Sequence, residues 1–185
     1  MGIRSTAKAI IVQNGKILLN KCVDEKNGDY YTLPGGGQNT FESLSETLVR
    51  ECLEETGYSV SPIKLIALCE EIYDDPISRE KFPEYAHKLH HIFICKLCSD
   101  KQQAPTEKDS SQIESEWVAI SSINNIRLLP HYLGKNIVTM INSETQTFFS
   151  TEHIPLTYDW FAFSIAMIFG WISFENVIVD LPPAQ

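Results

Sequence analysis

The sequence predicts an α/β fold, and three observations support this prediction. Two β-prone apolar runs flank Asn14-Gly15 near the N-terminus, a glycine-rich turn leads into an amphipathic helical segment, and further strand-like runs precede a second helical segment. The chain has 185 residues, of which 43% are hydrophobic, so it can bury one substantial core. A second full domain is not expected.

The first two strands are predicted to form a hairpin. Residues 7–13 and 16–22 are the β-prone runs, and Asn14-Gly15 is a strong signal for a two-residue hairpin turn. A short strand over residues 30–33 then brings the chain to the turn at residues 33–37, which contains three consecutive glycines. Glycines allow a close backbone approach that side chains would block.

The helix after this turn is predicted to begin near residues 40–43. Asn39 with Glu42, or Ser43 with Glu46, resembles a capping box, and Gly57 is suited to end the helix. Every fourth residue in between is apolar, which predicts a stripe that packs against the sheet. The residues of this stripe are Leu44, Leu48 and Cys52.

The remaining elements are three strands, over residues 63–73, 89–97 and 116–120, and a helix after Pro130. We therefore predict one domain over residues 1–145 and a C-terminal extension over residues 146–185. Residues 160–174 of this extension carry no charge, but a membrane-spanning helix needs about 20 apolar residues. Packing on the domain or at an oligomer interface is therefore favoured over membrane contact.

Three carboxylates on the first helix are the main functional signal. Glu51, Glu54 and Glu55 have the spacings i, i+3 and i+4, which place them on one helix face. Like charges at these spacings destabilise a helix by about 0.2–0.5 kcal/mol per pair, so folding alone does not explain them. Carboxylates are ligands that Mg²⁺ prefers, and it usually shares them with substrate phosphates. Taken alone, such a face is more often simply solvated.

The residues around these carboxylates favour the metal-site interpretation. The sequence resembles the Nudix box, Gly-x5-Glu-x7-Arg-Glu-U-x-Glu-Glu-x-Gly-U. Five residues separate Gly36 from Glu42, seven separate Glu42 from Arg50, and the run from Arg50 to Tyr58 completes the pattern. Every fixed polar and glycine position is filled. The two departures are Cys52 and Tyr58 at the U positions, which are usually Ile, Leu or Val, and both residues can be buried there.

The resemblance extends over roughly residues 5–142. It implies a mixed β-sheet sandwiched between α-helices. It also implies that the protein, with Mg²⁺ or Mn²⁺, hydrolyses a nucleoside diphosphate linked to another moiety by water attack on phosphorus. The substrate could be a nucleotide sugar, ADP-ribose, a dinucleotide or a nucleoside triphosphate. The alternative is a catalytically silent sensor or regulatory module that binds a nucleotide or ADP-ribose.

The resemblance also implies roles for individual residues. The metal ligands would be the carboxylates of Glu51, Glu54 and Glu55 and the backbone carbonyl of Gly36, with Glu51 favoured as the general base. Glu42 and Arg50 would hold the loop and the helix together. These two residues are eight apart, about two helical turns, so they lie on a similar face.

Two further contacts are predicted less specifically. Some Nudix proteins take an additional Glu from a loop before the last strand, and four residues of this chain are candidates. These are Glu107, Asp109, Glu114 and Glu116. Spacing does not single one out, and Glu114 is kept as a possible contact to metal or substrate. His90 lies on the strand expected near the cleft, where it could contact phosphate or act in proton transfer.

Charge and cysteine content narrow the partners and the compartment. The net charge of −9 argues against nonspecific nucleic-acid binding, which requires a basic patch. We therefore expect a small-molecule substrate, no nucleic-acid or membrane partner, and possibly a homodimer. The five cysteines are an odd number, and no hydrophobic segment at the N-terminus suggests a signal peptide. Both observations favour a reducing compartment, by default the cytoplasm.

Overall fold

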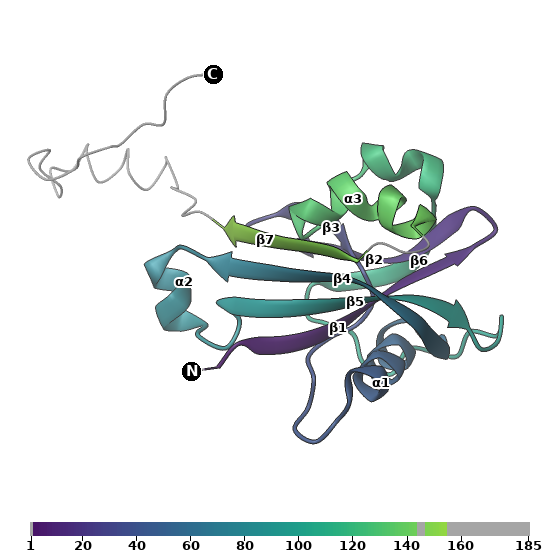
Figure 1. Cartoon of the computed structure of the whole chain (residues 1–185), viewed down its shortest axis with the longest axis horizontal. Coiled ribbons are helices and arrows are strands. Elements are labelled where there is room, and N and C mark those ends of the chain that lie inside the picture. The colour runs from purple at the N-terminus through teal and green to yellow at the C-terminus, as the bar shows by residue number, and fades with distance from the viewer. Residues whose placement is uncertain (1, 144–146, 155–185) are drawn as a thin grey trace, which may run out of the picture.

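The strands of this computed structural model form one mixed, strongly curled sheet with helices on both sides (Figure 1). Residues 2–143 and 147–154 are described, so the apolar run at residues 160–174 lies outside the described part. The sheet order is β3-β2-β1-β5-β4-β7, and β6 pairs with β2 off this path. The β1–β5 and β4–β7 pairs are parallel and the others are antiparallel. The predicted fold class is confirmed.

The elements follow one another in an order close to the predicted one. They are β1 (Arg4–Gln13), β2 (Lys16–Asp24), β3 (Gly28–Thr32), α1 (Leu44–Thr56), β4 (Val60–Tyr73), α2 (Pro76–Lys81), β5 (His87–Leu97), β6 (Gln112–Ala119), the 3-10 helix η1 (Ile120–Asn125), α3 (His131–Asn142) and β7 (Phe148–Ile154). No described helix has both the length and the apolar character needed to cross a membrane.

The β1–β2 hairpin is confirmed. Gln13 pairs with Lys16, and the two residues between them, Asn14 and Gly15, have φ angles of 51° and 72°. Both central residues of a type I′ turn need positive φ, and this turn matches the right-handed twist of the flanking strands.

Helix α1 has the predicted ends. The backbone N–H of Glu46 donates to Ser43 Oγ at 3.2 Å, and the N–H of Ser43 donates to Glu46 Oε2 at 2.8 Å, which completes the capping box. Gly57 ends the helix with φ 73°, and its N–H donates to the Leu53 carbonyl at 2.9 Å. A Cβ on Gly57 would lie 1.9 Å from the Gln103 carbonyl oxygen, so only glycine fits. The helix is therefore fixed at both ends beside the glycine turn.

The two faces of the sheet are covered by different helices. Leu48 and Cys52 of α1 are buried against Ala7, Ala9 and other residues on one face. On the other face, α3 packs its apolar side against strand residues; these α3 residues are Tyr132, Ile137, Met140 and Ile141. The resulting layers place α1 and α3 on opposite sides of the sheet (Figure 1).

Three elements, α2, η1 and β7, were not predicted from the sequence. Helix α2 has six residues and is capped by Asp75, whose side chain accepts from the N–H groups of Ile77 and Ser78. Strand β7 lies within the range predicted as a C-terminal extension, and it pairs in parallel with residues 67–73 of β4. Cys95 of β5 is buried, whereas Cys98, one residue beyond the end of this strand, is exposed.

Candidate active site

The guanidinium of Arg50 organises one side of the site. It forms a two-pronged pair with Glu42, with Nε 2.8 Å from Oε1 and Nη2 2.9 Å from Oε2. Its Nη1 donates to Glu51 Oε1 at 2.8 Å and to Glu54 Oε2 at 3.0 Å, and Nη2 also donates to the Gly37 carbonyl at 3.1 Å. All five N–H groups of the guanidinium are therefore used. These hydrogen bonds from Arg50 are the main reason why the pKa of Glu42 is lowered to about 2.

The Glu51 carboxylate lies directly against Gly36. A Cβ built on Gly36 would be only 2.3 Å from Glu51 Oε2. The glycine at this position is therefore required by the side chain that faces it, because any larger residue would displace Glu51.

Glu55 points inward from the same helix. Its side chain is buried, and Oε2 accepts from Asn20 Nδ2 and from the backbone N–H of Gly35, both at 2.8 Å. Burial raises the pKa of Glu55 to about 7, although the positive charge of Lys8 opposes this shift. Lys8 Nζ also donates to the Gly35 carbonyl, so a fixed positive charge lies beside the innermost carboxylate.

The structure assigns different partners to the two glycine carbonyls. The Gly36 carbonyl, which was the predicted metal ligand, accepts from the backbone N–H of Ala7 at 3.0 Å. The Gly35 carbonyl instead meets the Lys8 ammonium, near Glu55. Gly35 has φ 120°, and a Cβ there would lie 2.1 Å from the Ala7 carbonyl oxygen. Gly35 is thus the glycine whose carbonyl already contacts a cationic group.

The residues of the site fit a divalent cation in their chemistry and placement. Within residues 2–143 and 147–154, no three His, Cys, Asp or Glu side chains form a preassembled metal cluster. However, oxygens of Glu51 and Glu54 both lie within 3.0 Å of the same nitrogen, Arg50 Nη1. The two carboxylates therefore already converge on one positive position. With Glu55 they offer the hard oxygen donors that Mg²⁺ prefers.

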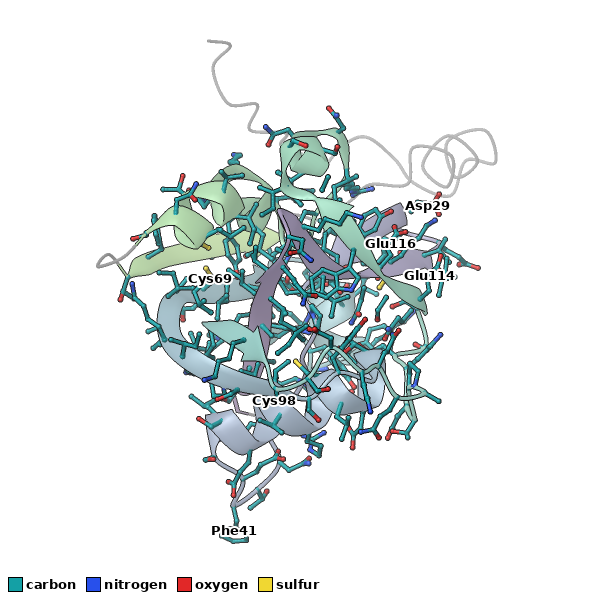
Figure 2. The ribbon with its side chains drawn as sticks, turned by 90° about the vertical axis from the view of Figure 1, so that its right-hand side faces the viewer. Asp29, Phe41, Cys69, Cys98, Glu114 and Glu116 are labelled. Atoms are coloured by element: carbon teal, nitrogen blue, oxygen red, sulfur yellow. The ribbon has the colours of Figure 1, made fainter. Side chains whose placement is uncertain are left out.

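The acidic residues before and within β6 divide into two groups. Glu114 is exposed opposite Lys21, and Glu116 accepts from the Tyr31 hydroxyl. Both lie near Asp29 at one edge of the molecule (Figure 2). Glu114 does not line the cavity, and its predicted role stays a prediction. Asp109 instead lines a cavity next to the site, and its negative charge acts on Glu55.

The loop that carries Asp109 is anchored to the end of α1. The backbone N–H groups of Thr106 and Glu107 donate to the Glu54 carbonyl at 3.0 and 3.1 Å. Of the four predicted candidates, this loop brings Asp109 to the cavity.

The cavity beside the carboxylates has a volume of about 260 Å³. Lys8 lines this cavity and also contacts the Gly35 carbonyl, so the cavity is adjacent to the carboxylate site. His90, which was predicted to lie near the cleft, is buried in its wall, with Nδ1 2.8 Å from Thr6 Oγ1. Burial lowers the pKa of His90, which favours the neutral ring.

Sequence reasoning missed the residues that β1, β2, β4 and β5 contribute to this region. Lys8 interrupts an apolar run in β1, and Glu71 follows Glu70 directly after an apolar run in β4, which is a signal that could have been noticed. Asn20 and Lys88 carry no comparable signal, because their partners are far away in the chain. Asn20 meets Glu55, and Lys88 meets Glu71.

Comparison with known proteins agrees with the resemblance seen in the sequence. The NUDIX domain family matches residues 3–137. Among curated proteins, the chain is 27% identical over 99 residues to a putative ADP-ribose pyrophosphatase, YjhB, of Bacillus subtilis, covering 54% of this chain and 43% of that protein. It is 24% identical over 147 residues to putative nudix hydrolase 1 of Caenorhabditis elegans, covering 76% and 35%. The chain thus spans less than half the length of these relatives.

Solved structures share the fold. A NUDIX hydrolase from Nitrosomonas europaea has a TM-score of 0.61 and 21% identity over 79% of this chain and 93% of its own. A UDP-X diphosphatase has a TM-score of 0.58 and 18% identity over 80% of this chain and 68% of its own. At these identities the likeness concerns the fold alone.

Proposed function

Since the chain belongs to the Nudix family, we propose that it is a metal-dependent pyrophosphohydrolase. The substrate would be a nucleoside diphosphate linked to another moiety, cleaved by water attack on phosphorus. The observation that carries this proposal is the convergence of Glu51 and Glu54 on Arg50 Nη1, with Gly36 against Glu51 and Glu55 on the adjacent inner side.

The proposed metal ligands are the carboxylates of Glu51, Glu54 and Glu55 and the carbonyl of Gly35. We propose Gly35 in place of the predicted Gly36 because the Gly35 carbonyl already contacts the Lys8 ammonium, whereas the Gly36 carbonyl accepts from the Ala7 N–H. A bound Mg²⁺ or Mn²⁺ would neutralise charge on the diphosphate and lower the pKa of water.

The protein's own groups would position the reactants. Lys8 lines the cavity and contacts the Gly35 carbonyl, and it can pair with a phosphate oxygen there. Arg50 holds Glu51 and Glu54 in place. Glu51 is the proposed base, since its carboxylate faces the glycine turn that a diphosphate would approach.

The substrate class follows from several features. A cavity of about 260 Å³ suits part of a small molecule, and the net charge of −9 disfavours long RNA. One relative is named a putative ADP-ribose pyrophosphatase and one structural neighbour a UDP-X diphosphatase, which supports a nucleotide linked to a sugar. The five cysteines all lie within the described residues and form no disulfide, which suits the proposed cytoplasmic location.

The test is a screen of the full chain for phosphate and nucleotide release. A panel of nucleotide sugars, ADP-ribose, dinucleotides and nucleoside triphosphates would be incubated with Mg²⁺, with Mn²⁺ or with EDTA. We expect turnover of at least one compound with metal only, and its loss in Glu54→Gln but not in Glu114→Gln, an exposed carboxylate outside the site. Tight binding of a nucleotide or ADP-ribose without turnover would refute the hydrolase proposal and indicate a sensor module.

A further inference from the structure

A second polar centre lies across the cavity, on strands β4 and β5. In the antiparallel ladder Glu71 is opposite Lys88, and Cys69 is opposite His90. Side chains two apart on a strand point to the same face, so Glu71, Lys88 and His90 share one face. All three line the cavity together with Lys8, which connects it to the carboxylate site.

The charge within this centre is fixed. Lys88 Nζ lies 2.6 Å from Glu71 Oε1, and Glu71 is buried with 8% of its surface exposed. Burial alone would raise the pKa of Glu71, but the facing His90 and Lys88 outweigh it and lower the pKa to about 2. Glu71 is therefore an ionised acceptor in the cavity wall at physiological pH.

His90 brings an unsatisfied group to the same wall. The residue is 5% exposed, and its Nδ1 is occupied by Thr6 Oγ1 at 2.8 Å. Its Nε2 is buried and has no hydrogen-bond partner among the residues that the structure describes. The nearest carboxylate oxygen is Glu71 Oε2 at 3.9 Å, which is too far for a hydrogen bond. A buried polar atom without a partner is costly, so this nitrogen indicates a place for a ligand atom.

The distance of 3.9 Å between His90 Nε2 and Glu71 Oε2 indicates which kind of ligand can bind between them. An oxygen about 2.8 Å from both atoms can accept a hydrogen bond from His90 Nε2–H and donate one to Glu71 Oε2. A hydroxyl group does both. A phosphate oxygen only accepts, and it would be repelled by Glu71, whereas Lys8, which lines the same cavity beside Glu55, favours phosphate.

We propose that Glu71 and His90 together bind a sugar hydroxyl of the substrate, while its diphosphate lies toward Lys8 and the carboxylate site. The inference rests on the proposed function in taking a nucleoside diphosphate as the ligand. The proposed contact favours a diphosphate that carries a sugar over compounds that would place a terminal phosphate beside Glu71 and His90. A second cavity of about 610 Å³ shares Tyr73 and Lys88 with the first, which leaves room for the rest of such a moiety.

Two sources could supply the hydroxyl, the ribose of the nucleoside or the sugar beyond the diphosphate. Binding to the full chain would be measured by calorimetry in EDTA, so that the probes are not hydrolysed. The pair ADP and 2′,3′-dideoxy-ADP tests the nucleoside ribose, and the pair ADP-ribose and ADP tests the distal sugar. The corresponding uracil series is UDP, 2′,3′-dideoxy-UDP and UDP-glucose.

The variants separate a hydroxyl contact from a general structural effect. His90→Asn keeps a polar group near the Nδ1 position, beside Thr6, and removes Nε2, whereas His90→Gln restores a donor near the Nε2 position. Glu71→Gln removes the charged acceptor, and Glu71→Gln combined with Lys88→Met avoids leaving a buried lysine unpaired if the single variant folds poorly. Glu70→Gln is the control, because Glu70 lies next to Glu71 but does not line the cavity.

In one of the two probe pairs, the parent should bind the hydroxyl-bearing compound about tenfold or more tightly, as expected for hydrogen bonds to a charged group. This ratio should fall to about one in His90→Asn and in the Glu71 variants, return in part in His90→Gln, and stay unchanged in Glu70→Gln. A ratio near one for both pairs in the parent, a ratio that survives both substitutions, or no binding of any probe would overturn the proposal. Hydroxyl-dependent binding without turnover in the release screen would instead reject only the proposed function.

Discussion

Replacing Glu55 by Gln is predicted to make the metal-free protein more stable at alkaline pH while abolishing activity. The pKa of Glu55 is raised from its ordinary value of 4.5 to about 7 because the carboxyl group is buried. At acidic pH both the folded and the unfolded chain hold this proton, so the full stability is present. As the pH rises from about 4.5 to about 7, the unfolded chain releases the proton first, so the free energy of unfolding falls.

The size of this effect follows from the two pKa values. Each tenfold change in proton affinity corresponds to about 1.4 kcal/mol, so raising the pKa from 4.5 to about 7 costs about 3 kcal/mol above neutral pH. A glutamine cannot ionise, and its single carbonyl oxygen can still accept from Asn20 and from the Gly35 N–H, which share one oxygen of Glu55. The variant should therefore escape the penalty without losing these contacts.

The assay is urea unfolding in EDTA at pH 5 and pH 8, with Glu114→Gln as an exposed control. The stability difference between Glu55→Gln and the parent should grow by about 3 kcal/mol in favour of the variant between these two pH values. Added Mg²⁺ should then stabilise the parent and not the variant, since a ligand that binds only the native state raises its stability. An unchanged difference at the two pH values would refute the reasoning.

Three further predictions concern the same region. Gly36→Ala should lower kcat at least tenfold at near-parental thermal stability, because its Cβ would lie 2.3 Å from Glu51 Oε2. Gly37→Ala is the control and should have a much smaller effect on kcat, because its Cβ would meet only the flexible end of an arginine side chain. Equal losses of kcat in the two variants would contradict this account. Arg50→Lys should lower kcat by roughly ten- to a hundredfold and raise the Mg²⁺ concentration needed for the half-maximal rate. The reason is that a lysine cannot reproduce the two-pronged contact of Arg50 with Glu42. Unchanged kinetics would rule this prediction out. The free energy of unfolding of the parent should fall by about 3 kcal/mol relative to that of Glu71→Gln as the pH falls from about 4.5 to about 2, since the pKa of Glu71 is about 2; urea unfolding of both proteins measures this difference, and an unchanged difference would contradict the prediction.

The parts of the fold that could be predicted depend on residues close together in the sequence. The Asn14-Gly15 turn and the Ser43–Glu46 capping box each involve residues within a few positions of one another. Strand β7 could not be predicted in the same way, because it depends on pairing with β4, about eighty residues earlier in the chain.

The same distinction between local and distant contacts applies to the candidate site. The spacing of Glu51, Glu54 and Glu55 is local, so the sequence alone predicts that they share one helix face. The choice between the Gly35 and Gly36 carbonyls depends on which of them meets the Lys8 ammonium and which the Ala7 N–H, and these are tertiary contacts. Glu71 contacts Lys88 because the register of β4 and β5 places them opposite each other, and no spacing in the sequence predicts this register.

The use of all five Arg50 donors has a consequence for how the protein is made. In small zinc domains the metal is needed for folding, because the ligands have no other partner to hold them together. Here the arginine already acts as an internal counterion for Glu42, Glu51 and Glu54. We therefore expect the chain to complete its fold without metal. For the proposed metal-dependent enzyme, folding and activation would then be separate events, and the supply of metal would control the activity of the protein without controlling its amount.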